Sequence, residues 1–495
     1  MLFNSTEFAF FLPIVFLVYW SIGYAKIEDV LKLRLQNTFV VVASYVFYGW
    51  WDWRFLLLIA FTSFCSWGSG LLISRAASQS RSKAWMIANV VINLAILGVF
   101  KYHDFFVSEF GRLFGIDTNS LLLRIILPVG ISFYTFQALS YSIDIYRKRI
   151  EPTQDIIAFF AFIAFFPQLV AGPIERATNL LPQFLQNRRF GYDIGMDGMR
   201  QILWGMFKKI VIADGCAIYV DQVWATYPTQ TGSTLLLAAV LFAFQIYGDF
   251  SGYSDIAIGA AKLFGIKLMQ NFNYPYFSRD IAEFWRRWHI SLTTWFRDYV
   301  YIPLGGSRSE ISPLCKYPEV RRKEIIIRNT FVIFLVSGIW HGANWTFLVW
   351  GAYNALLFLP LILLGKNRKY TDQVAEDRLL PSWREALLML LTFALVVIGW
   401  IIFRTETISQ AWEYICGICR GSLFQMPSIP DMKRFLPLPI VLATLLVLEW
   451  FNRSRSHGLS FEYLSVRTRV TVCAYILVLI FLFGNQPQTF IYFQF

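Results

Sequence analysis

Apolar residues occur along this chain in blocks of 14–21 residues, close to the roughly 17–25 that cross about 30 Å of hydrocarbon as a helix. The clearest blocks are residues 8–24, 37–50, 55–73, 86–100, 125–145, 156–170, 235–250, 386–403, 436–451 and 470–483. Three weaker blocks, 202–223, 253–264 and 284–301, are interrupted by charged residues, which indicates half-helices or interfacial segments. Because a helix satisfies its own backbone inside a bilayer, we predict an all-α bundle of about 11–14 spanning or re-entrant helices.

Composition places the whole chain in a membrane. Of its 495 residues, 56% are hydrophobic and 15% are charged, and the mean hydropathy is +0.50. Ordinary soluble domains carry about 25% charged residues. No segment between the apolar blocks is long enough to bury a core of its own. We therefore predict a polytopic membrane protein with a single helical domain over residues 1–495.

The net charge of +12 comes from loops between the apolar blocks, which argues against nucleic acid as the partner. The basic clusters are Arg75, Arg81 and Lys83; Arg147–Arg149; Arg321–Lys323; and Lys366, Arg368 and Lys369. Short loops rich in Lys and Arg face the cytoplasm in membrane proteins. We expect these loops on the cytoplasmic side, membrane lipid as a surrounding partner, and no nucleic acid.

Cysteine usage gives no sign of a metal site. Cys416 and Cys419 form a CxxC pair, and the remaining cysteines are scattered. Structural zinc sites usually need a second pair or nearby histidines at fixed spacing. We expect these cysteines to pack within helices and no metal to bind.

The segment VSGIWHGANWTF, residues 336–347, places His341 in a run without charge between Arg328 and Lys366. As one helix, the 37 residues 329–365 would extend about 55 Å, nearly twice the hydrocarbon thickness. We therefore predict two arms that return to the cytoplasmic side, with His341 about 20 Å along the first arm. An imidazole at that depth needs a hydrogen-bond partner or a functional role, because burying an unpaired polar group in hydrocarbon is unfavourable.

The predicted surroundings of His341 are polar. If the first arm stays helical, Ser337, Asn344 and Trp345 share its face at the i−4, i+3 and i+4 positions. Together they form a candidate site in an apolar wall. The alternative is a purely structural histidine, since polar side chains and small residues also hold membrane helices together.

A second histidine, His289, lies in FWRRWHISLTTWFRDYVYIPLGG, residues 284–306. Aromatic residues recur there at helical spacing while Arg286 and Arg287 fall on other faces, which predicts an amphipathic helix at the membrane surface. An interfacial anchor explains the tryptophans but not the histidine, and no evident partner fixes the tautomer of His289. The remaining histidines, His103 and His457, have the context of surface residues.

Two carboxylates form a third polar concentration. Asp249 and Asp255 interrupt the apolar run QIYGDFSGYSDIAIG, residues 245–259. Carboxylates at membrane depth need partners or water. They are candidates to orient the histidines, to bind arginine, or to accompany a kink at Gly248 and Gly252.

Several long strings follow one another along the chain: MLFNSTEFAFFLPIVFLVYW, LPVGISFYTFQALSYSIDIYR, QLVAGPIER, QIYGDFSGYSDIAIG, NFNYPYFSRDIAEFWRRWHISLTTWFRDYVYIPLGG, SGIWHGANWTFLVWGAYN, WIIFR and TFIYFQF. In this order they resemble the membrane-bound O-acyltransferases, in particular the bacterial branch of the alginate O-acetylation protein and the teichoic acid D-alanyl transferase. The opening and closing strings are more similar to the alginate branch. The resemblance implies a core at residues 120–365 that carries both histidines, flanked by helices in 1–120 and 385–495.

The resemblance also implies roles for the histidines. It makes His341, in the WHG string, the catalytic residue and His289, in the RRWH string, the second signature residue. A neutral imidazole can take the proton of an acceptor hydroxyl as that hydroxyl attacks a thioester carbonyl. His289 is then a candidate to bond a carbonyl oxygen or the acyl donor, and Asn344 to stabilise the oxyanion. The other candidates for substrate contact are Ser337, Trp345, Asp249, Asp255, Arg286 and Arg287.

The function implied by the resemblance is acyl transfer across a bacterial cytoplasmic membrane. The donor is expected to be acetyl-CoA or an acyl-carrier thioester, with no bound cofactor, and the acceptor a hydroxyl of an extracytoplasmic polysaccharide. An SGNH-type acetyltransferase and the polysaccharide machinery are the expected protein partners.

Other functions stay open. The acyl group or acceptor could differ, as in a D-alanyl, lipid or protein O-acyltransferase. A transporter would also place His and Asp at mid-membrane, but it should show paired broken helices in related repeats, which this chain lacks. A non-catalytic membrane subunit would tolerate loss of the histidines, and both are present.

Overall fold

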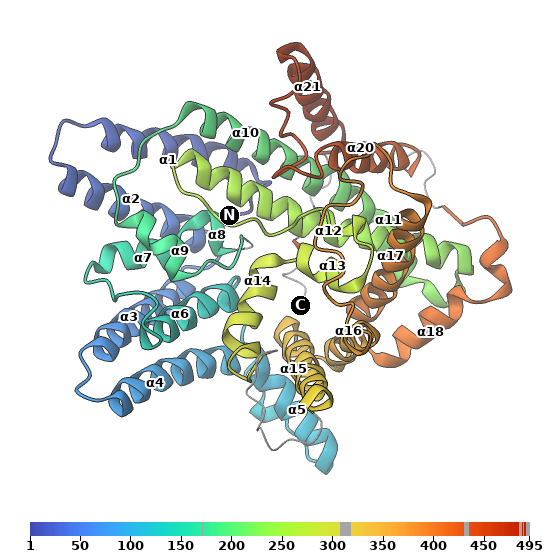
Figure 1. The fold of residues 1–495 in the computed structure, drawn as a ribbon, viewed down its shortest axis with the longest axis horizontal. Helices are drawn as coiled ribbons and strands as arrows, with labels where there is room; N and C mark the ends of the chain where they lie inside the picture. Colours follow the sequence, from blue (N-terminus) through green and yellow to red (C-terminus); the bar gives the residue numbers. More distant parts are fainter. Residues whose placement is uncertain (171, 307–317, 430–434, 485–487, 489, 492–495) are drawn as a thin grey trace. The chain divides into compact units, whose positions relative to one another are not determined.

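The computed structural model describes residues 1–170, 172–306, 318–429, 435–484, 488 and 490–491, and every element in these ranges is helical (Figure 1). Nine of the described helical segments are long and apolar enough to cross a membrane. They are α1 (Thr6–Tyr24), α2 (Asp29–Gly49), α3 (Arg54–Ser74), a segment from α4 (Gln79–Leu97) through α5 (His103–Phe114), α12 (Gly232–Leu263), α15 (Pro318–His341), α16 (Trp345–Leu363), α17 (Trp383–Arg404) and α21 (Val466–Phe483). The prediction of an all-α, polytopic membrane protein is confirmed.

The chain forms two compact units. The first comprises residues 1–203 and 253–269, and the second comprises residues 204–252 and 270–495. Besides α1–α5, the first unit contains α6 (Ile131–Tyr146), α7 (Ile156–Ala164), α8 (Phe166–Leu169), α9 (Ala177–Phe184) and most of α10 (Tyr192–Met206). The second contains α11 (Asp214–Ala225), α13 (Ile281–Arg287), α14 (Ile290–Phe296), α15–α17, α18 (Ile408–Ile418), α20 (Leu438–Phe451) and α21. Both candidate histidines therefore lie in the second unit.

In the first unit, α3, α4 and α6 pack against one another (Figure 1). Their contact contains buried polar side chains. The amide of Asn89 on α4 donates to the Ser142 hydroxyl on α6 at 2.6 Å, and Ser69 on α3 lies 3.0 Å from the same hydroxyl. Hydrogen bonds of this kind hold helices together where lipid removes the hydrophobic driving force.

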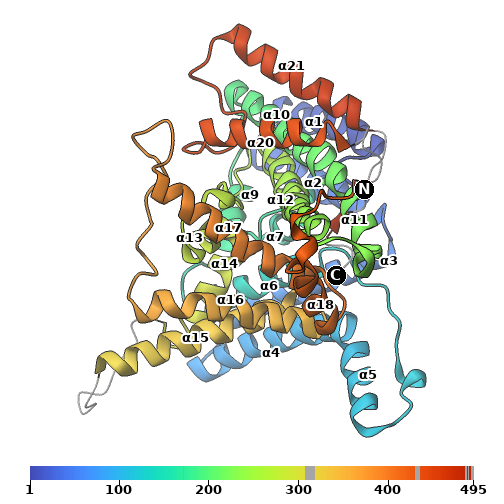
Figure 2. The same cartoon turned by 90° about the vertical axis from the view of Figure 1, so that its right-hand side faces the viewer.

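In the second unit, α15 and α16 run side by side as a helical hairpin, and α17 packs on α16 (Figure 2). Glycines permit the close approach of the two arms. A Cβ at Gly338 would lie 2.2 Å from the Phe347 carbonyl oxygen, and one at Gly351 would lie 2.3 Å from that of Phe334. The prediction that residues 329–365 form two arms rather than one span is confirmed.

The expected break between the apolar blocks 235–250 and 253–264 is wrong. Helix α12 runs through both without interruption for 32 residues. Gly248 and Gly252, expected at a kink, lie instead at a close helix contact, where an added Cβ would meet the carbonyl oxygens of Lys208 and Gly205 at 2.8 Å. Glycines four residues apart share one helix face, so they allow close packing without bending the helix.

Candidate active site

His341 is the last residue of α15, and its side chain is 8% exposed. Three aromatic rings meet its imidazole edge-on. The ring centroids lie at 4.8 Å for Trp340 on α15, 5.1 Å for Trp350 on α16 and 5.2 Å for Phe403 on α17. Three helices thus fix this histidine at the turn of the hairpin.

Asn344 does not share a helix face with His341, contrary to expectation, because α15 ends at the histidine. Asn344 instead caps the next helix. Its side-chain oxygen accepts the Thr346 N–H at 3.0 Å, and its amide donates to the Glu406 carbonyl at 2.8 Å. Asparagine is among the preferred N-cap residues because its oxygen satisfies a free N–H of the first turn. The side chain therefore fixes the start of α16.

The other two expected neighbours of His341 differ in burial. Ser337 lies one turn earlier on α15 and is buried. Trp345 is the first residue of α16 and is 48% exposed. The i+4 relation predicted for Trp345 fails for the same reason as for Asn344, since the chain leaves the helix at Gly342.

His289 lies between two short helices, α13 and α14, and not within one amphipathic surface helix. Its backbone has φ 45° and ψ 54°, in the left-handed region, which ends α13 and starts α14. Its side chain is 1% exposed, and most of α13 is buried. The prediction of one amphipathic surface helix for this segment is therefore wrong, because the backbone breaks at His289 and both short helices are largely buried.

The imidazole of His289 has a definite hydrogen-bond partner. Its Nδ1 lies 3.1 Å from Oδ1 of Asn271, which also accepts the Ser291 hydroxyl at 2.9 Å. The Nε2 atom is buried and has no hydrogen-bond partner among the described residues. His289 lies outside the nine candidate spans, and burial lowers its pKa to about 3. The ring is therefore neutral near pH 7.

The two histidines contact a common indole. Trp340 lies with its ring centroid 6.2 Å from that of His289 and 4.8 Å from that of His341. Phe250 meets the His289 ring edge-on at 4.6 Å, and Phe272 stacks on it at 6.4 Å. Both histidines thus contact the same indole within one aromatic cluster.

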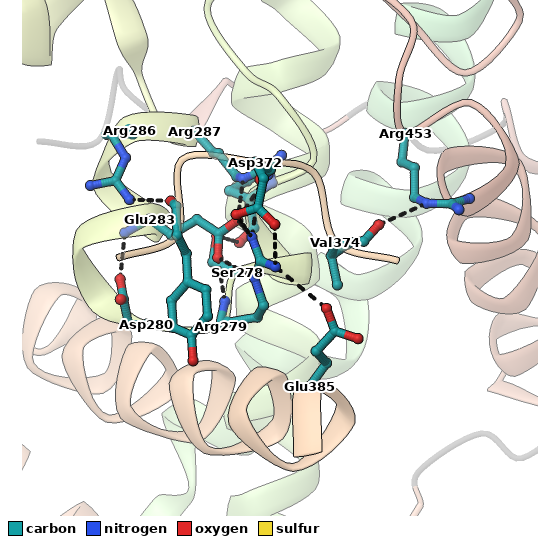
Figure 3. A network of polar contacts seen from close by, with 12 residues as sticks. Ser278, Arg279, Asp280, Glu283, Arg286, Arg287, Asp372, Val374, Glu385 and Arg453 are labelled. Atoms are coloured by element: carbon teal, nitrogen blue, oxygen red, sulfur yellow. Dashed lines mark hydrogen bonds and ion pairs between the residues drawn. The ribbon is translucent and has the colours of Figure 1, made fainter. Parts of the chain in front are cut away.

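Arg286 and Arg287 bind protein groups. Arg286 donates to the carbonyl oxygens of Asn367 at 3.0 Å and Tyr370 at 2.5 Å. Arg287 forms an ion pair with Glu283 at 2.8 Å (Figure 3). Arg286 thus binds the segment that connects α16 and α17, and Arg287 binds a residue of its own helix, α13.

A neighbouring arginine completes this polar network. Arg279 pairs with Glu283 at 3.1 Å, Asp372 at 3.1 Å and Glu385 at 3.4 Å (Figure 3). Its guanidinium is buried, and multidentate pairing of this kind offsets the loss of hydration. The network joins the start of α13 to the beginning of α17.

Asp249 binds a lysine and not an arginine or a histidine. Lys209 lies 2.8 Å from Asp249 and 2.9 Å from Asp214, and all three side chains are buried. The Lys209 ammonium also donates to the Gln488 carbonyl, and Asp249 accepts the Ile491 N–H at 2.6 Å. This ion-pair cluster therefore links Gln488 and Ile491 to α12.

Asp255 lies in the first unit and accepts the Gln201 amide at 2.8 Å. Asp249 and Asp255 therefore belong to different units, although they are six residues apart on one helix. The continuous helix thus directs them to separate partners, Lys209 for Asp249 and Gln201 for Asp255.

Sequence reasoning missed Asn271 and Lys209, and it misplaced His457. His457 is buried, and its Nδ1 accepts the Leu459 N–H at 3.2 Å. Lys209 carried a visible signal, because it is a charge inside an apolar block. Asn271 carried none, since it lies 18 residues before the histidine that it contacts.

Comparisons with known proteins cover the part of the chain that carries both histidines. Residues 147–370, which contain His289 and His341, match the model of the membrane-bound O-acyltransferase family. The chain is 41% identical to the probable alginate O-acetylase of Pseudomonas aeruginosa, over 83% of this chain and 74% of that protein. It is 34% identical to the peptidoglycan O-acetyltransferase of Helicobacter pylori, over 84% of this chain and 80% of that protein.

A more distant relative acts with a different acyl group. The teichoic acid D-alanyltransferase of Bacillus subtilis is 28% identical, over 56% of this chain and 68% of that protein. Similarity that spans most of the chain, and that includes the buried hairpin and its histidine, shows that this multi-pass membrane protein belongs to the membrane-bound O-acyltransferase family.

Proposed function

We propose that this protein moves an acetyl group from a cytoplasmic thioester to a hydroxyl of an extracytoplasmic polysaccharide, across the inner membrane of a bacterium. Two relatives are named for O-acetyl transfer, one to alginate and one to peptidoglycan. The observation that carries the proposal is the position of His341 at the turn of an apolar hairpin, held by rings from three helices.

In the proposed reaction His341 is the general base. Its neutral ring takes the proton of the sugar hydroxyl while the hydroxyl oxygen bonds to the thioester carbonyl carbon. The carbon–sulfur bond then breaks, and the proton passes to the departing thiolate, which leaves as a thiol. General-base catalysis of this kind typically contributes about 10²–10⁴-fold.

The proposed donor is acetyl-CoA or an acyl-carrier thioester. We expect the basic residues of 305–328 to attract such an anion. Residues 307–317 of this range lie outside the described part of the chain. Arg321, Arg322 and Lys323, at the start of α15, are described and exposed. An SGNH-type partner on the outer side would receive the acetyl group if transfer is relayed.

Ester analysis of cell-surface polymers tests the proposed function. We expect a strain that lacks the gene to lose alkali-labile acetate from one exopolymer, and the restored gene to return it. Loss of ester-linked D-alanine instead of acetate would favour the activity of the B. subtilis relative. Unchanged esters of both kinds would contradict the proposal.

We expect His289→Gln to retain more activity than His289→Asn. The Gln amide extends as far as Nε2, whereas the Asn amide extends only as far as Nδ1. Asn tolerates the left-handed backbone at this position, so its loss of activity would not reflect strain. Acetyl transfer by membranes that contain equal amounts of each variant measures the difference. Equal activity of the two variants would contradict a role for Nε2.

A further inference from the structure

The hydrogen bonds around Asn271 establish which of its side-chain atoms faces His289. The Ser291 backbone N–H, which can only donate, points to Asn271 Oδ1 at 3.3 Å. The Ser291 hydroxyl donates to the same oxygen at 2.9 Å. The atom that faces this group of donors is therefore the amide oxygen, which can only accept.

An acceptor opposite Nδ1 determines the tautomer of His289. The two atoms lie 3.1 Å apart, so Nδ1 carries the proton and donates it. In a neutral imidazole the other nitrogen then has a lone pair and no proton. Nε2 of His289 is thus a buried acceptor without a hydrogen-bond partner among the residues that the structure describes. Leaving a buried acceptor unpaired is unfavourable, so a bound donor would be favoured there.

The backbone holds Asn271 and His289 together. The Ile290 N–H donates to the Asn271 carbonyl at 2.8 Å, and the Asn273 N–H donates to the Arg287 carbonyl at 2.9 Å. These two bonds flank His289, whose left-handed conformation is uncommon for a residue other than glycine. Uncommon backbone conformations persist where the surroundings fix them. The contact between the Asn271 and His289 side chains is therefore held in place by the surrounding backbone.

We propose that Asn271 is a positioning residue that keeps His289 in the Nδ1–H tautomer, so that Nε2 accepts a hydrogen bond from the attacking hydroxyl. A thioester carbonyl offers only acceptor atoms, so this tautomer cannot bond it through Nε2. The inference rests on the proposed function and replaces the expectation that His289 bonds a carbonyl oxygen. It gives the two histidines different tasks: His341 removes the proton, and His289 orients the group that carries it.

The tautomer can be measured without substrate. The chain has four histidines, so nitrogen NMR of protein labelled with [¹⁵N]histidine gives few signals, and comparison with His289→Gln assigns those of His289. We expect a protonated Nδ1 and an unprotonated Nε2 in the wild type, and a mixture or the opposite tautomer in Asn271→Ala. A protonated Nε2 in the wild type, or the same tautomer in both proteins, would overturn the inference.

Kinetics of acetyl transfer supply the second readout. We expect Asn271→Ala to lower kcat by about 10–100-fold, the loss seen when the outer hydrogen-bond partner of a metal-bound histidine is removed. Asn273→Ala is the matched control, because it removes the same amide two residues away, where only the backbone of Asn273 forms hydrogen bonds with described residues. Equal kcat values for the two variants would overturn the inference.

Asn271→Asp separates positioning from packing, because it keeps the shape of the side chain. A carboxylate beside Nδ1 favours the imidazolium, in which Nε2 is protonated, and raises the pKa of His289. Because the pKa of His289 starts from about 3, a carboxylate that raises it by about 1–3 leaves the ring neutral at pH 7. We expect the activity of Asn271→Asp to match that of the wild type near pH 7 and to fall below it as the pH drops under about 6, where the proton on Nε2 is gained. A pH-independent loss, or none, would indicate a packing role.

The two readouts distinguish failure of the inference from failure of the proposed function. A wild-type protein with the opposite tautomer that still transfers acetyl groups contradicts only the inference. A wild-type protein with the expected tautomer that transfers no acetyl group contradicts the proposed function.

Discussion

His341→Gln is expected to lower acetyl transfer by about 10²–10⁴-fold, because it removes the general base. Glutamine is chosen over alanine because it keeps a polar side chain of similar volume among the three aromatic rings. Alanine would leave a cavity, and cavities in packed cores destabilise proteins in addition to any chemical effect. The rate of label transfer from [¹⁴C]acetyl-CoA to polymer in membranes is the measurement.

His457→Gln is the matched control for that experiment. His457 is also buried in the second unit, and it contacts its own loop through the Leu459 N–H. We expect His457→Gln to transfer acetyl groups at the wild-type rate. Equal rates for His341→Gln and the wild type, with both proteins folded, would remove His341 from the mechanism.

Lys209→Met is expected to destabilise the protein by about 3–5 kcal/mol, because it leaves two buried carboxylates without their shared cation. Asp214 and Asp249 lie within 2.9 Å of the Lys209 ammonium, and the Gln488 carbonyl accepts from the same group. Thermal unfolding of the purified protein in detergent is the measurement. The C-terminal residues near Phe490 should become susceptible to protease at the same time.

Two further variants test the origin of that loss. Lys262→Met removes a lysine that pairs with Asp197 in a more accessible position, so we expect a cost below about 1 kcal/mol. Combining Lys209→Met with Asp214→Asn and Asp249→Asn should recover part of the stability, because no buried charge is then left alone. Equal destabilisation by Lys209→Met and Lys262→Met would contradict the account of the cluster.

The cluster also bears on the candidate active site. Asp249 accepts a hydrogen bond from the N–H of Ile491, and the preceding residue, Phe490, is buried. The ring centroid of Phe490 lies 6.4 Å from that of Phe250. Phe250 in turn meets the His289 ring at 4.6 Å. Loss of Lys209 is therefore expected to lower acetyl transfer as well as stability.

The hairpin around His341 could be predicted from the sequence because its signal is simple. A run without charge that is too long for one span must turn, and charged residues mark both of its ends. The turn itself could not be located. Its position depends on the end of α15 at His341 and on Asn344, which caps α16, and a local cap of this kind decides where a helix begins.

The environment of His289 could not be predicted from local spacing. Continuous helical periodicity over residues 284–301 favoured one helix, yet His289 interrupts it with a left-handed backbone. That conformation depends on Asn271 and its neighbours, which are distant in sequence. The continuity of α12 was missed for a related reason, since the partners of Asp249 and Asp255 lie on other helices.

Acetyl transfer by the purified protein tests the central claim most directly. Protein in lipid nanodiscs is supplied with [¹⁴C]acetyl-CoA and, in separate reactions, with alginate or peptidoglycan fragments. We predict that the wild type places alkali-labile label on a polysaccharide hydroxyl and releases one CoA per acetyl group transferred, and that His341→Gln does neither above background. Equal transfer by the wild type and His341→Gln would contradict direct catalysis at His341. So would a purified wild type that acetylates neither polymer, if native membranes that contain the protein acetylate one of them.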